Sequence, residues 1–192
     1  MNKHKGVIIA VSAPSGTGKT TIVKKILKVF PELVFSVSAT TRQKRENEID
    51  GVDYFFITEN DFRKKIDKGE FVEWEKFYDY YYGTYKSFIE NNIEQGKSVI
   101  VEIDVNGALE LKRIYPESIL IFIYPPSFQE LENRLRKRNT EDESDYKKRI
   151  ERAKMELSLK HKFDYLIENK DLEKAYLETK NLISKIISKE NN

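Results

Sequence analysis

The amino-acid sequence predicts an α/β fold, a three-layer sandwich with a central parallel sheet between helices, and three observations support it. The apolar run at residues 7–11 leads through a glycine-rich turn into a segment with helical periodicity. Further nearly continuous apolar runs, typical of strands buried on both faces, recur along the chain. Helical patterns separate these runs, and such alternation indicates a doubly wound sheet.

The expected core elements follow in chain order. After the strand at residues 7–11, we expect core strands at residues 33–37, 98–103 and 118–124, and a weaker one at 165–167. We expect helices at residues 21–27, 107–114, 130–138, 144–159 and 172–188. The core of a single domain, residues 1–192, would then comprise residues 1–37, 91–124 and 159–192.

Two segments interrupt the alternation. The first, at about residues 38–90, carries short strand patterns at 54–57 and 71–74, a helical pattern near 59–68 and aromatic residues at 78–82. We interpret this aromatic cluster as too rich in hydroxyl groups for ordinary core filling, and we expect an inserted subdomain of mixed α/β structure. The second, at about residues 125–158, carries arginines on two helical stretches and is expected to form a helical lid.

Composition restricts the class of protein. The 192 residues suit one domain, and a net charge of only +2 argues against nucleic acid as a partner. The chain has no cysteine, and no apolar run approaches the roughly 20 residues of a membrane helix. The first apolar run is also too short for a signal peptide. We expect a cytoplasmic protein without a membrane or nucleic-acid partner, either a monomer or a homodimer.

The strongest chemical signal lies in the glycine-rich turn, which matches the P-loop pattern G-x-x-x-x-G-K-[ST] except at Ala13. In a P-loop, backbone N–H groups and the helix dipole bind phosphate, while Lys19 would reach the β- and γ-phosphates and Thr20 would ligate Mg²⁺. Ala13 fits if its φ is negative and its side chain clears the nucleotide. A chance glycine-rich turn is the alternative. The expected ATP-binding residues are Ala13, Pro14, Ser15, Gly16, Thr17, Gly18, Lys19, Thr20 and Thr21.

Two arginines follow the second core strand. Arg42 and Arg45 come after a strand that ends near Ser38, and ligands of open α/β sheets bind at the carboxyl ends of strands. Together with a tyrosine hydroxyl, these side chains fit a bidentate clamp for a second phosphate group. A solvated basic turn is the alternative.

Glu73 is a candidate base-reading residue in the strand pattern at residues 71–74. We expect it to point to the same side as Phe71 and away from Val72 and Trp74. A carboxylate accepts two parallel N–H bonds, which guanine offers at N1 and N2 and adenine does not. Because a desolvated, unpaired charge is costly, one such residue would discriminate strongly. An ordinary edge-strand glutamate is the alternative.

Two carboxylates, Glu102 and Asp104, stand at the end of the strand at residues 98–103. Beside a P-loop, an acidic residue at this place fits a role in holding the water shell of Mg²⁺. Capping of the following helix by Asp104 is the alternative, and one residue could cap while the other serves the metal.

Four arginines of the expected lid are spaced so that Arg134 and Arg138 share one helix face, and Arg149 and Arg152 share another. Phosphoryl transfer needs positive charge over the moving group, and a closing flap would supply it and expel water. A solvated helix face balanced by neighbouring glutamates is the alternative.

In their order and spacing these motifs resemble guanylate kinases over essentially the whole chain. The matching segments are residues 12–20, S-x-T-T-R-x-x-R at 38–45, G-x-D-Y-x-F at 51–56, F-V-E-W at 71–74, Y-Y-G-T at 81–84, E-I-D-x-x-G at 102–107 and the arginines of 134–149. Two positions depart from the usual pattern: Thr84 stands where serine is frequent, and Glu102 where aspartate is usual.

The resemblance implies direct, in-line transfer from ATP to GMP with Mg²⁺ as the cofactor, and leaves dGMP as a further candidate acceptor. Residues 38–90 would bind GMP, and Mg²⁺ would be held by Thr20 and, through water, Glu102. The catalytic residues would be Lys19, Arg134, Arg138 and Arg149. The GMP-binding residues would be Ser38, Arg42, Arg45, Tyr54 and Tyr82 for the phosphate, and Glu73, Thr84 and Asp104 for guanine. The alternatives are a non-catalytic protein-binding module of similar fold and a related kinase with another phosphorylated acceptor.

Overall fold

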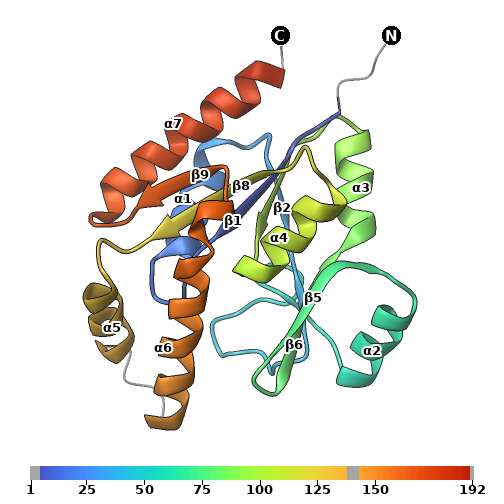
Figure 1. Ribbon diagram of the computed structural model, residues 1–192. Coiled ribbons are helices and arrows are strands. Elements are labelled where there is room, and N and C mark those ends of the chain that lie inside the picture. The colour runs from blue at the N-terminus through green and yellow to red at the C-terminus, as the bar shows by residue number, and fades with distance from the viewer. Residues whose placement is uncertain (1–4, 138–142, 191–192) are drawn as a thin grey trace.

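A five-stranded parallel sheet forms the centre of the computed structural model, which describes residues 5–137 and 143–190 (Figure 1). Its spatial order is β2-β7-β1-β8-β9, and its strands are β1 (Ile8–Ser12), β2 (Val34–Ser36), β7 (Val99–Glu102), β8 (Ile119–Tyr124) and β9 (Tyr165–Glu168). The pairings are parallel throughout, which confirms the predicted parallel sheet. Because β1 is the middle strand, the loop that follows it leaves from the centre of the sheet.

Helices cover both faces of this sheet, namely α1 (Lys19–Val29), α3 (Lys86–Glu94), α4 (Val105–Ile114) and α7 (Leu172–Glu190). Alternate residues of β1 enter different cores. Ile9 and Val11 pack in a cluster with residues of α1 and α7, whereas Ile8 and Ala10 pack in a cluster with residues of α3 and α4. Since side chains alternate along a strand, a strand covered on both faces must be apolar throughout. The predicted three-layer arrangement is confirmed.

The inserted segment forms a second, mixed sheet of order β4-β3-β6-β5. Its elements are β3 (Ala39–Thr40), β4 (Phe55–Phe56), α2 (Glu59–Asp67), β5 (Phe71–Phe77) and β6 (Tyr80–Tyr85). Phe62, Phe71 and Tyr81 build a small core between α2 and the sheet. Our interpretation of the aromatic cluster was therefore wrong for Tyr81, which is buried with its ring 5.3 Å from that of Phe62. Pairing with β5 places residues 80–82 of the cluster in a strand, and alternate strand residues turn inward.

The segment expected to form the lid contains α5 (Phe128–Lys137) and α6 (Glu143–Ser158), and a short 3₁₀ helix, η1 (Lys160–Lys162), follows it. Leu131 and Leu135 of α5 pack against Ile150 and Ala153 of α6. Figure 1 shows that these two helices and the inserted sheet extend from the same end of the central sheet. Among the described residues, no helix combines the length and apolar character needed to span a membrane.

Candidate functional site

The P-loop joins β1 to α1 and has the backbone that phosphate binding requires. Gly16 and Gly18 have φ values of 89° and 86°, a left-handed conformation that glycine adopts readily. A Cβ atom at Gly18 would also lie only 2.9 Å from Nδ2 of Asn169. Ala13, in contrast, is buried and has no positive φ, so its backbone accepts alanine. The first turn of α1 carries no acidic residue, which leaves its N-terminus suited to an anion.

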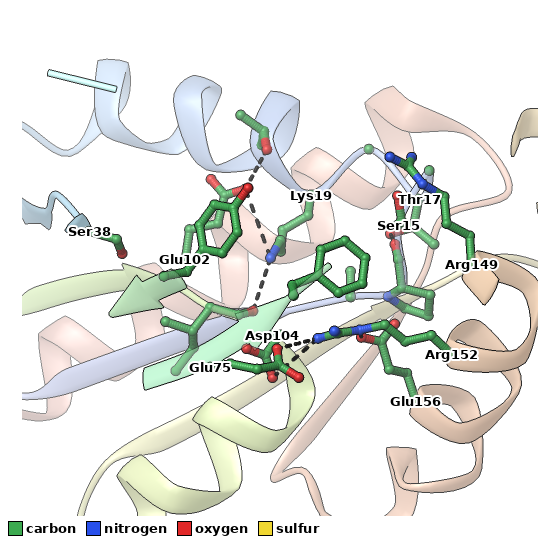
Figure 2. Close-up of a pocket in the computed structure, with 18 of the residues that line it drawn as sticks. Ser15, Thr17, Lys19, Ser38, Glu75, Glu102, Asp104, Arg149, Arg152 and Glu156 are labelled. Carbon is green, nitrogen blue, oxygen red and sulfur yellow. Dashed lines mark hydrogen bonds and ion pairs between the residues drawn. The ribbon is translucent and has the colours of Figure 1, made fainter. Parts of the chain in front are cut away.

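Lys19, Thr20 and Glu102 meet at the carboxyl end of the sheet. The Lys19 ammonium donates to the carbonyl of Ile103 at 2.9 Å and lies 4.0 Å from Oε1 of Glu102. The Thr20 hydroxyl donates to the same carboxylate oxygen. Figure 2 shows the Glu102 carboxylate next to the Lys19 ammonium. The longer glutamate at position 102 therefore still reaches the P-loop threonine.

A pocket of about 350 Å³ connects the P-loop to the insert and the lid. All nine predicted ATP-binding residues, 13–21, line it. Of the predicted GMP-binding and lid residues, those that line it are Ser38, Tyr54, Glu73, Tyr82, Asp104 and Arg149. Segments from the core, the insert and the lid thus face one another across one cavity.

A β-bulge decides which way Glu73 points. The pairing of β5 with β6 shifts register between Phe71, which faces Tyr85, and Glu73, which faces Thr84. Since cross-strand partners lie on the same face of a sheet, Glu73 lies opposite Phe71. Our expectation that these two residues share a face was wrong, because one extra residue in the bulge interrupts the alternation. The bulge turns Glu73 away from the aromatic core of the insert and into the pocket.

The Glu73 carboxylate is buried, with 7% of the residue exposed, and lies between three groups. The fully buried Thr84 donates its hydroxyl to Oε1 at 2.5 Å. A Cβ atom at Gly107 of α4 would lie 2.6 Å from Oε2, so a glycine there allows the close approach. Burial raises the pKa of Glu73 to about 7, and the negative charge of Asp104 adds to the shift.

Asp104 caps the helix that follows it, which is one of the roles considered for this residue. Its Oδ1 accepts from the backbone N–H of Gly107 at 3.0 Å, so it caps α4. It also lines the pocket beside Glu73. Capping holds the carboxylate at a defined place at the start of the helix.

The predicted phosphate clamp is only partly assembled. The hydroxyl-bearing residues Ser38, Tyr54 and Tyr82 line the pocket, and burial raises the pKa of Tyr54 to about 12, so its phenol keeps its proton. The Arg42 guanidinium instead makes two hydrogen bonds to Glu48, at 2.8 and 2.9 Å, over the ring of Tyr54. The hydrogen bonds from Arg42 lower the pKa of the Glu48 carboxyl.

Arg45, the second arginine of the clamp, is exposed, and its backbone N–H donates to Glu48. Neither Arg42 nor Arg45 lines the pocket.

The lid arginines occupy different places. Figure 2 shows Arg149 of α6 beside Ser15 and Thr17 of the P-loop. Arg134 of α5 donates to Glu130 at 2.8 Å and to the carbonyl of Asn169 at 3.0 Å, and it does not line the pocket. Arg138 lies outside the described residues.

Six pocket residues were absent from the predicted binding and catalytic residues, and of these only Arg152 had been considered, as one of the four lid arginines. They are Glu75, Phe77, Gly83, Ile103, Arg152 and Glu156. Glu75 and Phe77 follow Glu73 at intervals of two residues. Because side chains alternate along a strand, both lie on the face that Glu73 presents to the pocket. Arg152 and Glu156 are one helical turn apart on α6 and are joined by a hydrogen bond of 2.9 Å. The sequence shows the spacing of Arg152 and Glu156, but it does not show which strand or helix they would face.

Comparison with known proteins agrees with this geometry. Residues 4–186 match the family model described as guanylate kinase. The chain is 48% identical to a guanylate kinase of Thermotoga maritima, over 89% of this chain and 83% of that protein. It is 49% identical to one of Carboxydothermus hydrogenoformans, over 90% and 84%. The crystal structure of guanylate kinase from Anaplasma phagocytophilum matches with a TM-score of 0.78 and 31% identity, over 96% of this chain and 88% of that one. The chain therefore belongs to the guanylate kinase family.

Proposed function

We propose that this chain transfers the γ-phosphoryl group of ATP directly to GMP, giving ADP and GDP. One observation carries the proposal: the P-loop and a buried carboxylate that matches guanine line the same pocket. A donor site and an acceptor site that share one cavity can bring two nucleotides into line.

The donor half binds the triphosphate. Backbone N–H groups of the loop and the N-terminus of α1 offer positive partial charge to the phosphates. The Lys19 ammonium, which now contacts the Ile103 carbonyl, is placed to move onto the β- and γ-phosphate oxygens and stabilise the charge that develops there. The Arg149 guanidinium lies beside the loop and would add positive charge over the transferred group.

The acceptor half selects guanine. Ionised Glu73 accepts from N1–H and the N2 amine, while Thr84 holds its Oε1 and Asp104 offers a further acceptor. Adenine has an acceptor at N1 and no amine at C2, so it would leave the Glu73 carboxylate without a hydrogen-bond partner. Burying an unpaired carboxylate costs the full desolvation of a charged group. The two N–H donors of guanine also favour the ionised form of Glu73 in the complex.

The phosphate of GMP would meet Ser38, Tyr54 and Tyr82, which already line the pocket, and Arg42 and Arg45. Glu48 holds the Arg42 side chain next to these tyrosines. We propose that Glu48 orients Arg42 toward the acceptor phosphate, since a guanidinium has donors enough to serve both partners.

Mg²⁺ is proposed to accompany ATP, and the side chains present fit it. The Thr20 hydroxyl and the Glu102 carboxylate are adjacent oxygen donors at the P-loop, the ligand type that Mg²⁺ prefers. When bound, the ion would neutralise charge on the phosphates. We propose that Thr20 ligates the ion directly and Glu102 through water, and that the reaction takes place in the cytoplasm, as the cysteine-free composition favours.

The test is an assay of ADP formation with GMP, AMP, CMP and UMP at matched concentration. We expect rapid turnover with GMP only; turnover with another acceptor and none with GMP would overturn the proposal. Equal rates with GMP and AMP would exclude the role of Glu73. Direct transfer further predicts that ATP labelled at the γ-phosphate leaves no label on the protein when GMP is omitted.

A further inference from the structure

Arg152 of the lid helix α6 is a point at which the three parts of the chain meet (Figure 2). Its Nη2 donates to Oε2 of Glu75 in the insert at 2.5 Å and lies 3.8 Å from Oδ1 of Asp104 in the core. Its Nε donates to Glu156 on its own helix at 2.9 Å. Its guanidinium carbon also lies 4.2 Å from the ring centre of Phe77, again in the insert.

These contacts are shielded from water, which makes them stronger than ordinary surface ion pairs. The Arg152 side chain is 19% exposed, and those of Glu75 and Glu156 are 27% and 6% exposed. Burial raises the pKa of Glu75 to about 7, Asp104 adds to the shift, and the bond from Arg152 opposes it. Removing one partner of such a cluster leaves the remaining charges poorly compensated.

The position of Arg152 separates its role from that of Arg149, three residues earlier on the same helix. Figure 2 shows Arg149 beside the P-loop, whereas Arg152 points toward Glu75 and Asp104. Glu75 follows the base-reading Glu73 by two residues on the same strand face, as their β6 partners Tyr82 and Thr84 also show. Arg152 therefore connects the lid to the guanine end of the site, away from the transferred phosphoryl group.

We propose that Arg152 is a positioning residue that fastens the lid helix to the GMP-binding insert through Glu75, and so makes tight GMP binding depend on lid closure. The inference rests on the proposed function. The contact of Arg152 with Glu75 is already formed in this structure, next to the capped Asp104. It would hold α6 against the insert, so that GMP bound at Glu73 is enclosed by the lid helix.

The test is steady-state kinetics of Arg152→Gln, Glu75→Gln and the double variant, with GMP and ATP varied separately. We expect each single variant to lower kcat/KM for GMP about tenfold or more and to change the KM for ATP less than twofold. Because both residues act through one contact, the double variant should lose little more than the worse single variant. Arg152→Lys, which keeps the charge, should recover part of the loss.

Arg113→Gln is the matched control, since it removes an exposed arginine that pairs with Glu110 on α4, and it should behave as wild type. Thermal melts check folding, and Glu75→Gln tests the contact independently if Arg152→Gln folds poorly. Three results would overturn the inference. The losses in kcat/KM for GMP could add in the double variant, the KM for ATP could rise as much as kcat/KM for GMP falls, or the single variants could stay within twofold of wild type in kcat/KM for GMP. Absence of GMP turnover in the wild type would instead overturn the proposed function.

Discussion

The donor and acceptor halves of the pocket are built in different ways. In the proposed function the donor half is mainly one continuous segment, residues 13–21, whose backbone groups would do most of the binding. The acceptor half is assembled from side chains that are distant in sequence, from Ser38 after β2 to Asp104 before α4 and Arg152 on α6. A local loop carries its geometry in its own backbone, whereas the acceptor half depends on how the insert and the lid pack. Substitutions should therefore separate the two halves.

The largest expected effect is in the donor half. Lys19→Ala removes the side-chain charge beside the phosphates, so we expect kcat to fall about 10²- to 10³-fold, the usual loss for one group that stabilises transition-state charge. Because the acceptor residues are elsewhere, GMP should bind nearly as in wild type. ADP formation and calorimetric titration of GMP measure the two quantities. Loss of GMP binding as well would show that the halves are not independent.

The second prediction concerns the acceptor half. Glu73→Gln replaces one acceptor by an amide that faces the guanine donors, so kcat/KM for GMP should fall about 100-fold, with little change in the KM for ATP. Glu70→Gln is the control, because Glu70 pairs with Lys65 outside the pocket and should keep wild-type kinetics. Similar losses from both variants would mean that the effect is not specific to guanine reading.

The third prediction is a pH dependence of the acceptor half. The pKa of Glu73, about 7 through burial and the charge of Asp104, lies above the value of about 4.3 in an unfolded chain. Only the ionised form offers two acceptors, so GMP affinity should fall as the pH is lowered through 7, by up to about tenfold per unit. The same shift stabilises the ligand-free fold fully below about pH 4.3, and that contribution is lost as the pH rises through 7.

Calorimetric titration of GMP between pH 6 and 8 measures this binding trend, and denaturant unfolding measures the stability trend. In Glu73→Gln, the part of the pH dependence that comes from Glu73 should disappear from both GMP affinity and unfolding stability. The pH dependence of GMP binding that remains should be that of the GMP phosphate itself. An unchanged profile in that variant would assign the pH dependence to another group.

The smallest expected effect is in the donor loop. Ala13 has no positive φ, so Ala13→Gly relieves no strain and makes the unfolded chain more flexible. We expect a loss of about 0.4–1 kcal/mol in the free energy of unfolding and a KM for ATP within twofold of wild type. Denaturant unfolding and initial rates check both. A lower KM for ATP in this variant would mean that the alanine side chain obstructs the nucleotide.

The sequence predicted the elements of the core more completely than those of the insert. The apolar strands and the P-loop were recognisable because their signals are local and periodic. The strand β6 and the helix α3 were not anticipated, because the tyrosines at residues 80–82 and the polar sequence of α3 lack the expected apolar pattern. The face of Glu73 was predicted wrongly, since a bulge depends on the partner strand and not on the residues of β5 alone.

By itself the sequence determined the parallel core and the glycine-rich turn between β1 and α1, and it supplied candidate residues for the site, because each rests on contiguous residues or short helical spacings. Only the tertiary structure decided which of these side chains meet. The bulge directs Glu73 and Glu75 into the pocket, Gly107 makes room for Glu73, and α6 brings Arg152 to Glu75 across 77 positions of sequence. Such contacts depend on the packing of separate elements, which no local pattern encodes.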